Sequence, residues 1–205
     1  MNKRDLQIKR DLERFRVMGR NDIADLYFSN LKDPVKSANT VLKRLVRDNQ
    51  IEVSKSFSPY VYFPYGSTMK RNSTKIPHFL KIVEVYKQLK QYTRIDSFIV
   101  EPKYKKGLAE PDIYTTIKGK SFFIEIQRNL YSRKVMDQKI KKYEALKHLN
   151  QFSKFPFIIM ISDSRYEINS DVLTVFQVAS IYEFMDNIKR NVTRESIKDI
   201  RIKIG

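Results

Sequence analysis

Apolar residues in the first third of the chain recur with two periods, one typical of helices and one typical of strands. Spacings of three and four residues predict helices over 4–18, 22–30 and 34–47. Asp33-Pro34 is expected to open the third helix, because proline suits a first helical turn. Short runs rich in β-branched and aromatic residues at 51–53 and 60–63 predict a β-hairpin. The buried stripe of the third helix is predicted to be Val35, Ala38, Val41, Leu42, Leu45 and Val46.

A helix, a short helix, a basic helix and a hairpin, in this order, are typical of a winged helix-turn-helix domain. The third helix of such a domain enters the major groove of DNA, where small polar and cationic side chains reach bases and phosphates. The outward face of the predicted third helix carries Ser37, Asn39, Thr40, Lys43, Arg44 and Arg47. Two alternatives stay open: a basic face that is only solvated, and a domain that contacts another protein.

A linker and a second patterned region follow the hairpin. Residues 66–76 are rich in Gly, Ser, Thr and Asn, which predicts a linker. Helices are then predicted over 77–92, 131–149 and 181–191, and strands over 94–100, 111–117, 121–127, 157–161 and 172–178. In the helix over 131–149, the residues expected to face inward are Val135, Ile140, Tyr143, Leu146 and Leu149. The fold class is therefore α/β or α+β, with a central mixed sheet flanked by helices, and we expect domains at 1–65 and 77–205.

Charge and composition narrow the choice of partner. The 205 residues include 40 Lys and Arg against 23 Asp and Glu, a formal net charge of +17, which indicates a polyanion such as nucleic acid. A membrane surface is the alternative, but no apolar run approaches the roughly 18 residues of a spanning helix, so we expect a soluble, cytoplasmic protein. Without cysteine and with only two histidines, the chain favours oxygen-ligated Mg²⁺, Mn²⁺ or Ca²⁺ over zinc.

Two carboxylates fall at matching ends of neighbouring predicted strands. Gly119 suits a tight turn between the strands over 111–117 and 121–127, and this pairing brings Asp112 and Glu125 to one end of the hairpin. Two carboxylates and a backbone carbonyl, here that of Ile126, form an oxygen site for a cation that lowers the pKa of an attacking water. The alternative for Glu125 is a solvent-facing position on a half-exposed strand.

The residues around these acids resemble the motif of PD-(D/E)XK nucleases. Pro111-Asp112 is similar to the first half of the motif, and Glu125-Ile126-Gln127 is similar to the second half, with Gln127 in place of a lysine. A lysine there can orient the attacking water and stabilise developing charge, whereas an amide can only hydrogen-bond. The resemblance also implies a further acidic metal ligand on the preceding helix, Glu84, for which Glu101 is the alternative.

Two residues of the following predicted helix could compensate for the missing lysine. Lys139 and Tyr143 are four residues apart and therefore lie on one helical face. Lys139 is interpreted in two ways, as a catalytic group or as one more cation that neutralises DNA phosphates. The DNA-contacting residues expected on the same helix are Arg133, Lys134 and Lys142.

The order of these motifs resembles the replication-relaxation family of plasmids and other mobile elements. The residues that carry the resemblance are Phe15-Arg16-Val17, Val41-Leu42-Lys43-Arg44-Leu45-Val46, Tyr62, His78, Pro111-Asp112, Glu125-Ile126-Gln127-Arg128, Lys139 and Tyr143. It implies a winged helix before a PD-(D/E)XK-like domain and a role in plasmid replication and DNA relaxation.

Two function classes follow from the sequence. In the first, the protein binds double-stranded DNA and nicks or cleaves it weakly with Mg²⁺ or Mn²⁺. In the second, the nuclease fold is inactive and the protein is a DNA-binding replication accessory or regulator. Either class is compatible with docking on a replication initiator or relaxase, and the oligomeric state stays open, a homodimer included.

Overall fold

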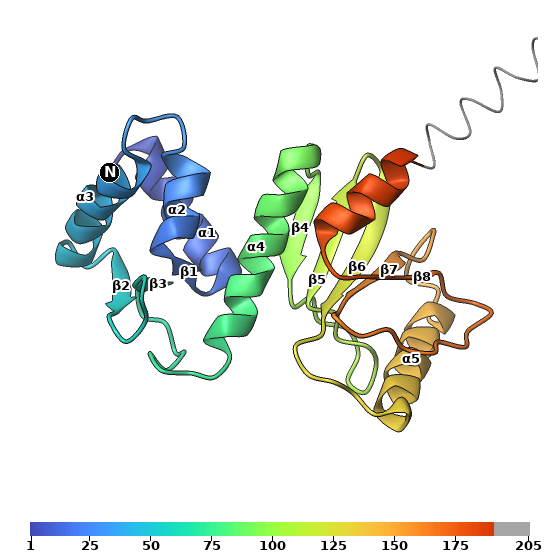
Figure 1. Cartoon of the computed structure of the whole chain (residues 1–205). Coiled ribbons are helices and arrows are strands. Elements are labelled where there is room, and N and C mark those ends of the chain that lie inside the picture. The colour runs from blue at the N-terminus through green and yellow to red at the C-terminus, as the bar shows by residue number, and fades with distance from the viewer. Residues whose placement is uncertain (191–205) are drawn as a thin grey trace, which may run out of the picture. The chain divides into compact units, whose positions relative to one another are not determined.

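Helices and strands alternate along the chain in a mixed α+β arrangement with two separate sheets (Figure 1). The computed structural model describes residues 1–190. The chain divides into two units, Met1–Lys87 and Gln88–Gly205. The α+β class predicted from the sequence is confirmed. Residues 66–75, which make up most of the predicted linker, lie within the first unit and contain no helix or strand.

The first unit contains three helices, a small sheet and the start of a fourth helix. The helices are α1 (Lys3–Phe15), α2 (Arg20–Tyr27) and α3 (Pro34–Arg47), and the strands are β1 (Met18–Gly19), β2 (Ile51–Ser54) and β3 (Val61–Pro64). Strand β3 pairs antiparallel with both of the others, so that Met18 lies opposite Tyr62 and Ile51 lies opposite Pro64. The sequence pattern does not predict β1, because two residues are too few to show an alternation.

Side-chain caps set the starts of α1 and α3. Asn2 accepts a hydrogen bond from the Asp5 amide while Asp5 accepts one from the Asn2 amide, which is a capping box. Asp33 accepts a hydrogen bond from the Lys36 amide at 2.8 Å. The prediction that Val35 is buried is wrong, since it is 38% exposed in the first turn of α3. Side chains at the end of a helix have fewer neighbours to cover them.

The second unit is built on a five-stranded mixed sheet with the order β4-β5-β6-β7-β8. Its strands are β4 (Ser97–Val100), β5 (Ile113–Ile117), β6 (Lys120–Ile126), β7 (Phe157–Ile161) and β8 (Val175–Val178). The first three pair antiparallel, and β7 and β8 add on in parallel. The hairpin of β5 and β6 turns at Lys118 and Gly119, which both have positive φ, as the predicted turn requires.

Two helices cover opposite faces of this sheet. Phe123 of β6 packs in one cluster with Tyr143 of α5 (Arg133–His148). The adjacent Phe122 points to the other face, where its ring lies 5.8 Å from that of Phe184, in the helix over 181–190. The last residue of the predicted final helix, Asn191, lies outside the described residues.

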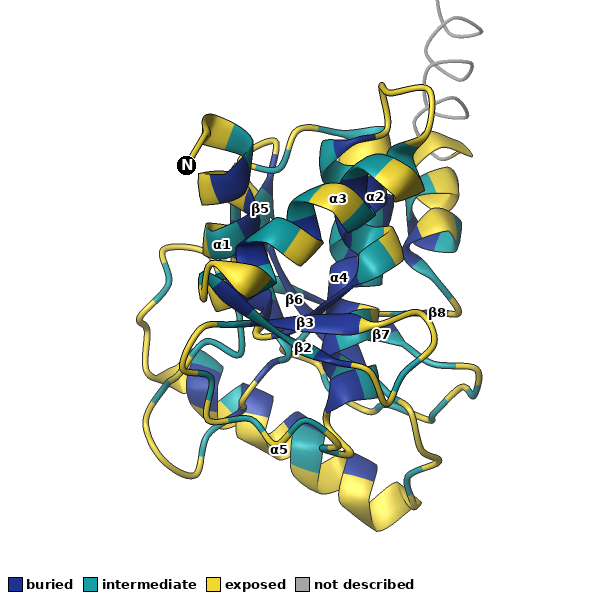
Figure 2. Cartoon of the chain, turned by 90° about the vertical axis from the view of Figure 1, so that its left-hand side faces the viewer, coloured by how far each residue is buried: buried dark blue, intermediate teal, exposed yellow. Residues whose placement is uncertain are grey.

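Ile140, Tyr143 and Leu146 of α5 are buried as predicted, but the two ends of the predicted buried face are wrong. Met136 is buried, whereas Val135 is 43% exposed, because the buried positions repeat every three or four residues through Met136, Ile140 and Tyr143. Leu149 is 39% exposed because it is the C-cap, beyond the last turn. The alternation of buried and exposed residues along α5 is visible in Figure 2.

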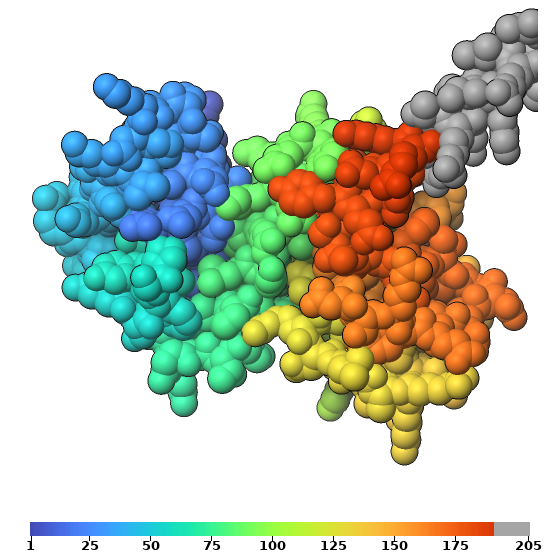
Figure 3. Space-filling view, in the orientation of Figure 1, coloured from blue at the N-terminus to red at the C-terminus, as the bar shows by residue number. Residues whose placement is uncertain are grey.

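The connection between β7 and β8 lies against α5. The Ser170 hydroxyl donates to the Glu144 carboxylate at 2.7 Å, and the Lys147 ammonium donates to the Val172 carbonyl. Figure 3 shows this connection in orange beside α5 in yellow. These two hydrogen bonds fix the connection between β7 and β8 to α5.

Helix α4 (Ile76–Tyr92) contributes to both units. In the first unit, the Tyr86 ring lies 5.2 Å from that of Phe15. In the second unit, the side chain of Gln88 accepts a hydrogen bond from the Ile181 amide at 3.3 Å. None of the helices within residues 1–190 has the length and apolarity that crossing a membrane requires.

Candidate functional site

Strand register brings Asp112 and Glu125 together at one end of the β5–β6 hairpin. Ile113 lies opposite Ile124, and one further step of the same register places Asp112 opposite Glu125. The Asp112 carboxylate accepts a hydrogen bond from the Ile126 amide at 2.7 Å. The Asp112 carbonyl accepts one from the Glu101 amide at 2.8 Å. Both the main chain and the side chain of Asp112 are therefore held by neighbouring strands.

Glu125 is a buried carboxylate with two partners from α5. It is 2% exposed, so the alternative of a solvent-facing position is wrong. Its Oε1 accepts a hydrogen bond from the Tyr143 hydroxyl at 2.5 Å, and its Oε2 lies 2.6 Å from the Lys139 Nζ. Because Lys139 and Tyr143 are one helical turn apart, α5 can place both beside a single carboxylate.

Burial and charge set the protonation of this cluster. Removal from water raises the pKa of Glu125 to about 7, the Asp112 charge acts in the same direction, and Lys139 opposes both. Burial, together with the Glu125 charge, also raises the pKa of Tyr143. Tyr143 therefore keeps its proton and donates a hydrogen bond to the Glu125 carboxylate.

The cluster is reached through a cavity of about 270 Å³ in the second unit. The residues that line it include Glu110, Glu125, Tyr131, Lys139, Lys142 and Tyr143. The Lys139 side chain is 22% exposed, so this ammonium lies between the buried carboxylate and the solvent. Lys139 is therefore paired with a buried carboxylate and is not a fully solvated surface cation.

Among the polar residues that line this cavity, three were not predicted from the sequence, namely Glu110, Tyr131 and Gln138. Glu110 directly precedes the Pro111-Asp112 motif, and Tyr131 directly precedes the cap of α5. Proximity to the predicted motifs was the only signal that could have pointed to them. The Lys139 ammonium lies 5.7 Å from the centre of the Tyr131 ring, so Tyr131 helps to hold this lysine.

The other predicted metal ligands and Gln127 have different surroundings. Gln127 is half-buried, and its amide donates to the Ile161 carbonyl at 2.9 Å. Glu84 belongs to the first unit, where the Lys81 ammonium lies 2.8 Å from its carboxylate. Within residues 1–190, no group of three or more Asp, Glu, His or Cys side chains is placed to hold a metal ion.

Asp112 and Glu125 nevertheless have the donor chemistry that a divalent cation requires. Both supply hard carboxylate oxygens, which suit Mg²⁺ and Mn²⁺. The Lys139 ammonium beside Glu125 shows that this position favours a positive charge. A bound divalent cation would share the Glu125 carboxylate with that ammonium or displace it.

In the first unit, α3 and the β2–β3 hairpin border a groove of about 770 Å³. Three of the predicted DNA-contacting residues line it, Asn39, Lys43 and Arg47. Its further lining includes residues that were not predicted, Arg20, Lys55, Tyr60 and Tyr62. No carboxylate lines this groove in the described part of the chain, so its charged side chains are all cations, and they lie beside aromatic and aliphatic ones.

The other predicted contacts on α3 are placed less uniformly. Thr40 is exposed and its hydroxyl donates to the Lys36 carbonyl at 3.1 Å, while Ser37 is half-buried. The Arg44 side chain is 38% exposed, and its guanidinium also has a partner on α1. Its Nη2 lies 3.0 and 2.9 Å from the two carboxylate oxygens of Asp5, a residue that is 1% exposed. A buried carboxylate needs such a partner, so Arg44 ties α3 to α1.

The predicted DNA contacts on α5 are all on its exposed side. Lys134 and Lys142 are exposed, and Lys142 also borders the cavity above Glu125. The Arg133 guanidinium lies 3.1 Å from the Glu167 carboxylate, and the two side chains are 68% and 64% exposed. Ion pairs this exposed contribute little to stability, so Arg133 can exchange Glu167 for a phosphate at small cost.

Comparison of the sequence with models of protein families and with curated proteins found no match.

Proposed function

We propose that the protein binds double-stranded DNA and hydrolyses its phosphodiester bonds with Mg²⁺ or Mn²⁺. The observation that carries this proposal is that Glu125, Lys139 and Tyr143 contact one another at one cavity, with Asp112 beside Glu125 on the neighbouring strand. The two acids have the oxygen ligands for a metal ion, and the Lys139 ammonium can bind a phosphate. The Tyr143 hydroxyl orients the Glu125 carboxylate.

The order of elements in each unit supports this function. Helices α1, α2 and α3 with strands β1, β2 and β3 follow the order of a winged helix-turn-helix domain. Helix α4, the antiparallel strands β4 to β6, helix α5 and the parallel strand β7 follow the order of a PD-(D/E)XK nuclease core. We therefore assign DNA binding to the first unit and hydrolysis to the second.

Each member of the cluster has a distinct chemical role in the proposed reaction. Asp112 and Glu125 would hold the metal ion, which would supply the activation of a water molecule and offset phosphate charge. Lys139 stabilises the negative charge that develops on the phosphate, the role that Gln127 cannot fill. Tyr143 donates its hydrogen bond to Glu125 and so keeps that carboxylate oriented.

The biological setting that we propose is replication or relaxation of a plasmid or another mobile element. It rests on the resemblance described above and on the net charge of +17, which suits a protein that acts on DNA. A replication initiator or a relaxase is the proposed protein partner, and the cytoplasm, where such DNA lies, is the proposed location.

A second candidate function is DNA binding without hydrolysis. The contact that favours it is the ion pair of Lys139 with Glu125, in which an ammonium already satisfies one metal ligand. In this case the protein is an accessory or regulator of replication, and the cluster only stabilises the second unit.

Incubation of the protein with supercoiled plasmid and Mn²⁺ or Mg²⁺ separates the two functions. Hydrolysis predicts nicked or linear product that is lost with a chelator and in Asp112→Ala. Asp137→Ala is the matched control, because Asp137 is an exposed acid on α5 of the same unit. Product that persists in Asp112→Ala, or no product with any metal, would contradict the hydrolytic function, and DNA retardation without product would establish the second one.

A further inference from the structure

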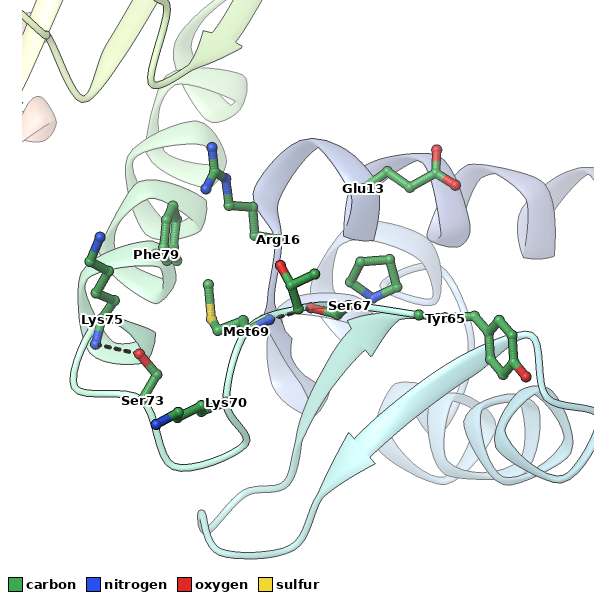
Figure 4. Close-up of a pocket in the computed structure, with 12 residues that line it drawn as sticks. Glu13, Arg16, Tyr65, Ser67, Met69, Lys70, Ser73, Lys75 and Phe79 are labelled. Carbon is green, nitrogen blue, oxygen red and sulfur yellow. Dashed lines mark hydrogen bonds between the residues drawn. The ribbon is translucent and has the colours of Figure 1, made fainter.

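The loop that joins β3 to α4 borders a second cavity of the first unit, with a volume of about 560 Å³. Cations from separate segments line it: Arg16 follows α1, Lys70 lies within the loop, and Lys75 precedes α4. Figure 4 shows these side chains around Met69 and Phe79. The cavity is distinct from the groove beside α3, with which it shares no lining residue.

The loop has no helix or strand, but the side chain of Arg71 holds it in place. Arg71 forms an ion pair with Glu52, its guanidinium lies 4.3 Å from the centre of the Phe63 ring, and it donates to the Met69 carbonyl at 2.9 Å. The Glu52 carboxylate also accepts a hydrogen bond from the Gly66 amide at 2.8 Å. The backbone of the loop is therefore fixed to β2 and β3, and the cavity is formed before any ligand binds.

The charge that the cavity presents is positive. Lys70 and Lys75 are exposed, and neither has a carboxylate partner among residues 1–190. Glu13 is the one acid in the described lining, and in Figure 4 its carboxylate points away from both lysines. An anion in this cavity would therefore meet two ammonium groups without having to displace a carboxylate.

Two hydroxyl groups of the same lining have donor capacity to spare. The Ser67 hydroxyl oxygen accepts from the Met69 amide at 3.3 Å, and the Ser73 hydroxyl oxygen accepts from the Lys75 amide at 3.2 Å. These contacts use the oxygen lone pairs and leave each O–H group to donate to a ligand. Flexible cations together with hydroxyl donors are suited to the oxygens of a phosphate group.

We propose that this cavity is a phosphate-binding site, formed by Lys70, Lys75 and Arg16 with the hydroxyls of Ser67 and Ser73. Its ligand is the phosphate backbone of a nucleic acid, which the loop contacts in addition to the contacts of α3. The site does not depend on hydrolysis in the second unit, nor on recognition of bases by α3.

Titration of the isotopically labelled full chain with inorganic phosphate tests the site directly. The backbone amides of Ser67 and Ser73 are expected to shift in the nuclear magnetic resonance spectrum, and sodium chloride at equal ionic strength should leave them in place. The shifts should be lost in the double variant Lys70→Gln, Lys75→Gln. They should persist in Lys3→Gln, Lys32→Gln, which removes the same charge from exposed positions outside the cavity.

Binding of a short DNA duplex over a range of salt concentrations then identifies the source of the phosphate. If the backbone of DNA occupies the site, the slope of log affinity against log salt should be smaller in the double variant Lys70→Gln, Lys75→Gln than in wild type, by roughly 0.9 for each lost contact. The decrease should be smaller in the control variant. Loss of the phosphate-induced shifts with an unchanged slope would assign the site to a free phosphate compound instead. If neither phosphate nor the duplex shifts the two amides in the wild type, the proposal is overturned, whatever the outcome for cleavage.

Discussion

The raised pKa of Glu125 predicts that Glu125→Gln changes how the stability of the second unit depends on pH. Burial raises the pKa from its ordinary value of 4.5 to about 7 in the folded protein. The folded state then binds more protons than the unfolded state between these two values. The stability that Glu125 contributes is therefore complete below about pH 4.5 and is lost as the pH rises through about 7.

The size of this effect follows from the difference between the two pKa values. One pKa unit corresponds to about 1.4 kcal/mol, so a rise from 4.5 to about 7 corresponds to roughly 3 kcal/mol. Because glutamine does not titrate, we expect Glu125→Gln to be more stable relative to wild type at pH 8 than at pH 5 by most of this amount, since part of the contribution is already lost at pH 5. Any constant cost of leaving Lys139 without its carboxylate cancels in the comparison of the two pH values.

Urea unfolding followed by circular dichroism at pH 5, 6, 7 and 8 provides the measurement, with separate transitions for the two units where they occur. Asp137→Asn is the matched control, because it removes an exposed carboxylate from the same helix that holds Lys139 and Tyr143. Wild type and Glu125→Gln with parallel stability curves over this range would refute the reasoning, since Glu125 would then titrate as it does in the unfolded chain.

Three further predictions concern the partners of these acids and the face of α3. Tyr143→Phe should lower the free energy of unfolding at pH 8 by about 1–3 kcal/mol, because a buried carboxylate loses a hydrogen bond; an unchanged urea midpoint would speak against that bond. Arg44→Ala should destabilise the first unit by about 2 kcal/mol, because it leaves Asp5 without its cation. Lys43→Ala should instead weaken DNA binding in a retardation assay and leave the urea midpoint unchanged. Weaker DNA binding with an unchanged urea midpoint in Arg44→Ala would place Arg44 on the DNA. If the second unit hydrolyses DNA, Lys139→Met should lower the rate on the order of 10²–10³-fold and Gln127→Lys should change it little, so faster nicking by Gln127→Lys would show that Lys139 does not supply the missing charge.

Local patterns were sufficient to predict most elements of both units. The helical spacing of apolar residues located α1, α3 and α5, because a helix that covers a core must repeat its buried side chains every three or four residues. The turn at Gly119 and the alternation of the flanking strands predicted that Asp112 and Glu125 meet, since a tight hairpin determines the register of its strands. For the same reason, the two acids of the candidate site could be predicted without a structure.

Contacts between distant segments were decided only by the tertiary structure. On the sequence, Arg44 is one of several cations on a helix face, and nothing local shows that its partner is Asp5 on another helix. The pairing of Lys139 and Tyr143 with Glu125 depends on how α5 is oriented on the sheet. The periodicity of α5 does not predict this orientation. The cavity beside Lys70 and Lys75 likewise depends on Arg71 fastening the loop to Glu52. Periodicity shows which face of an element is buried, but the partner of a buried charge is determined by packing between elements that are far apart in the chain.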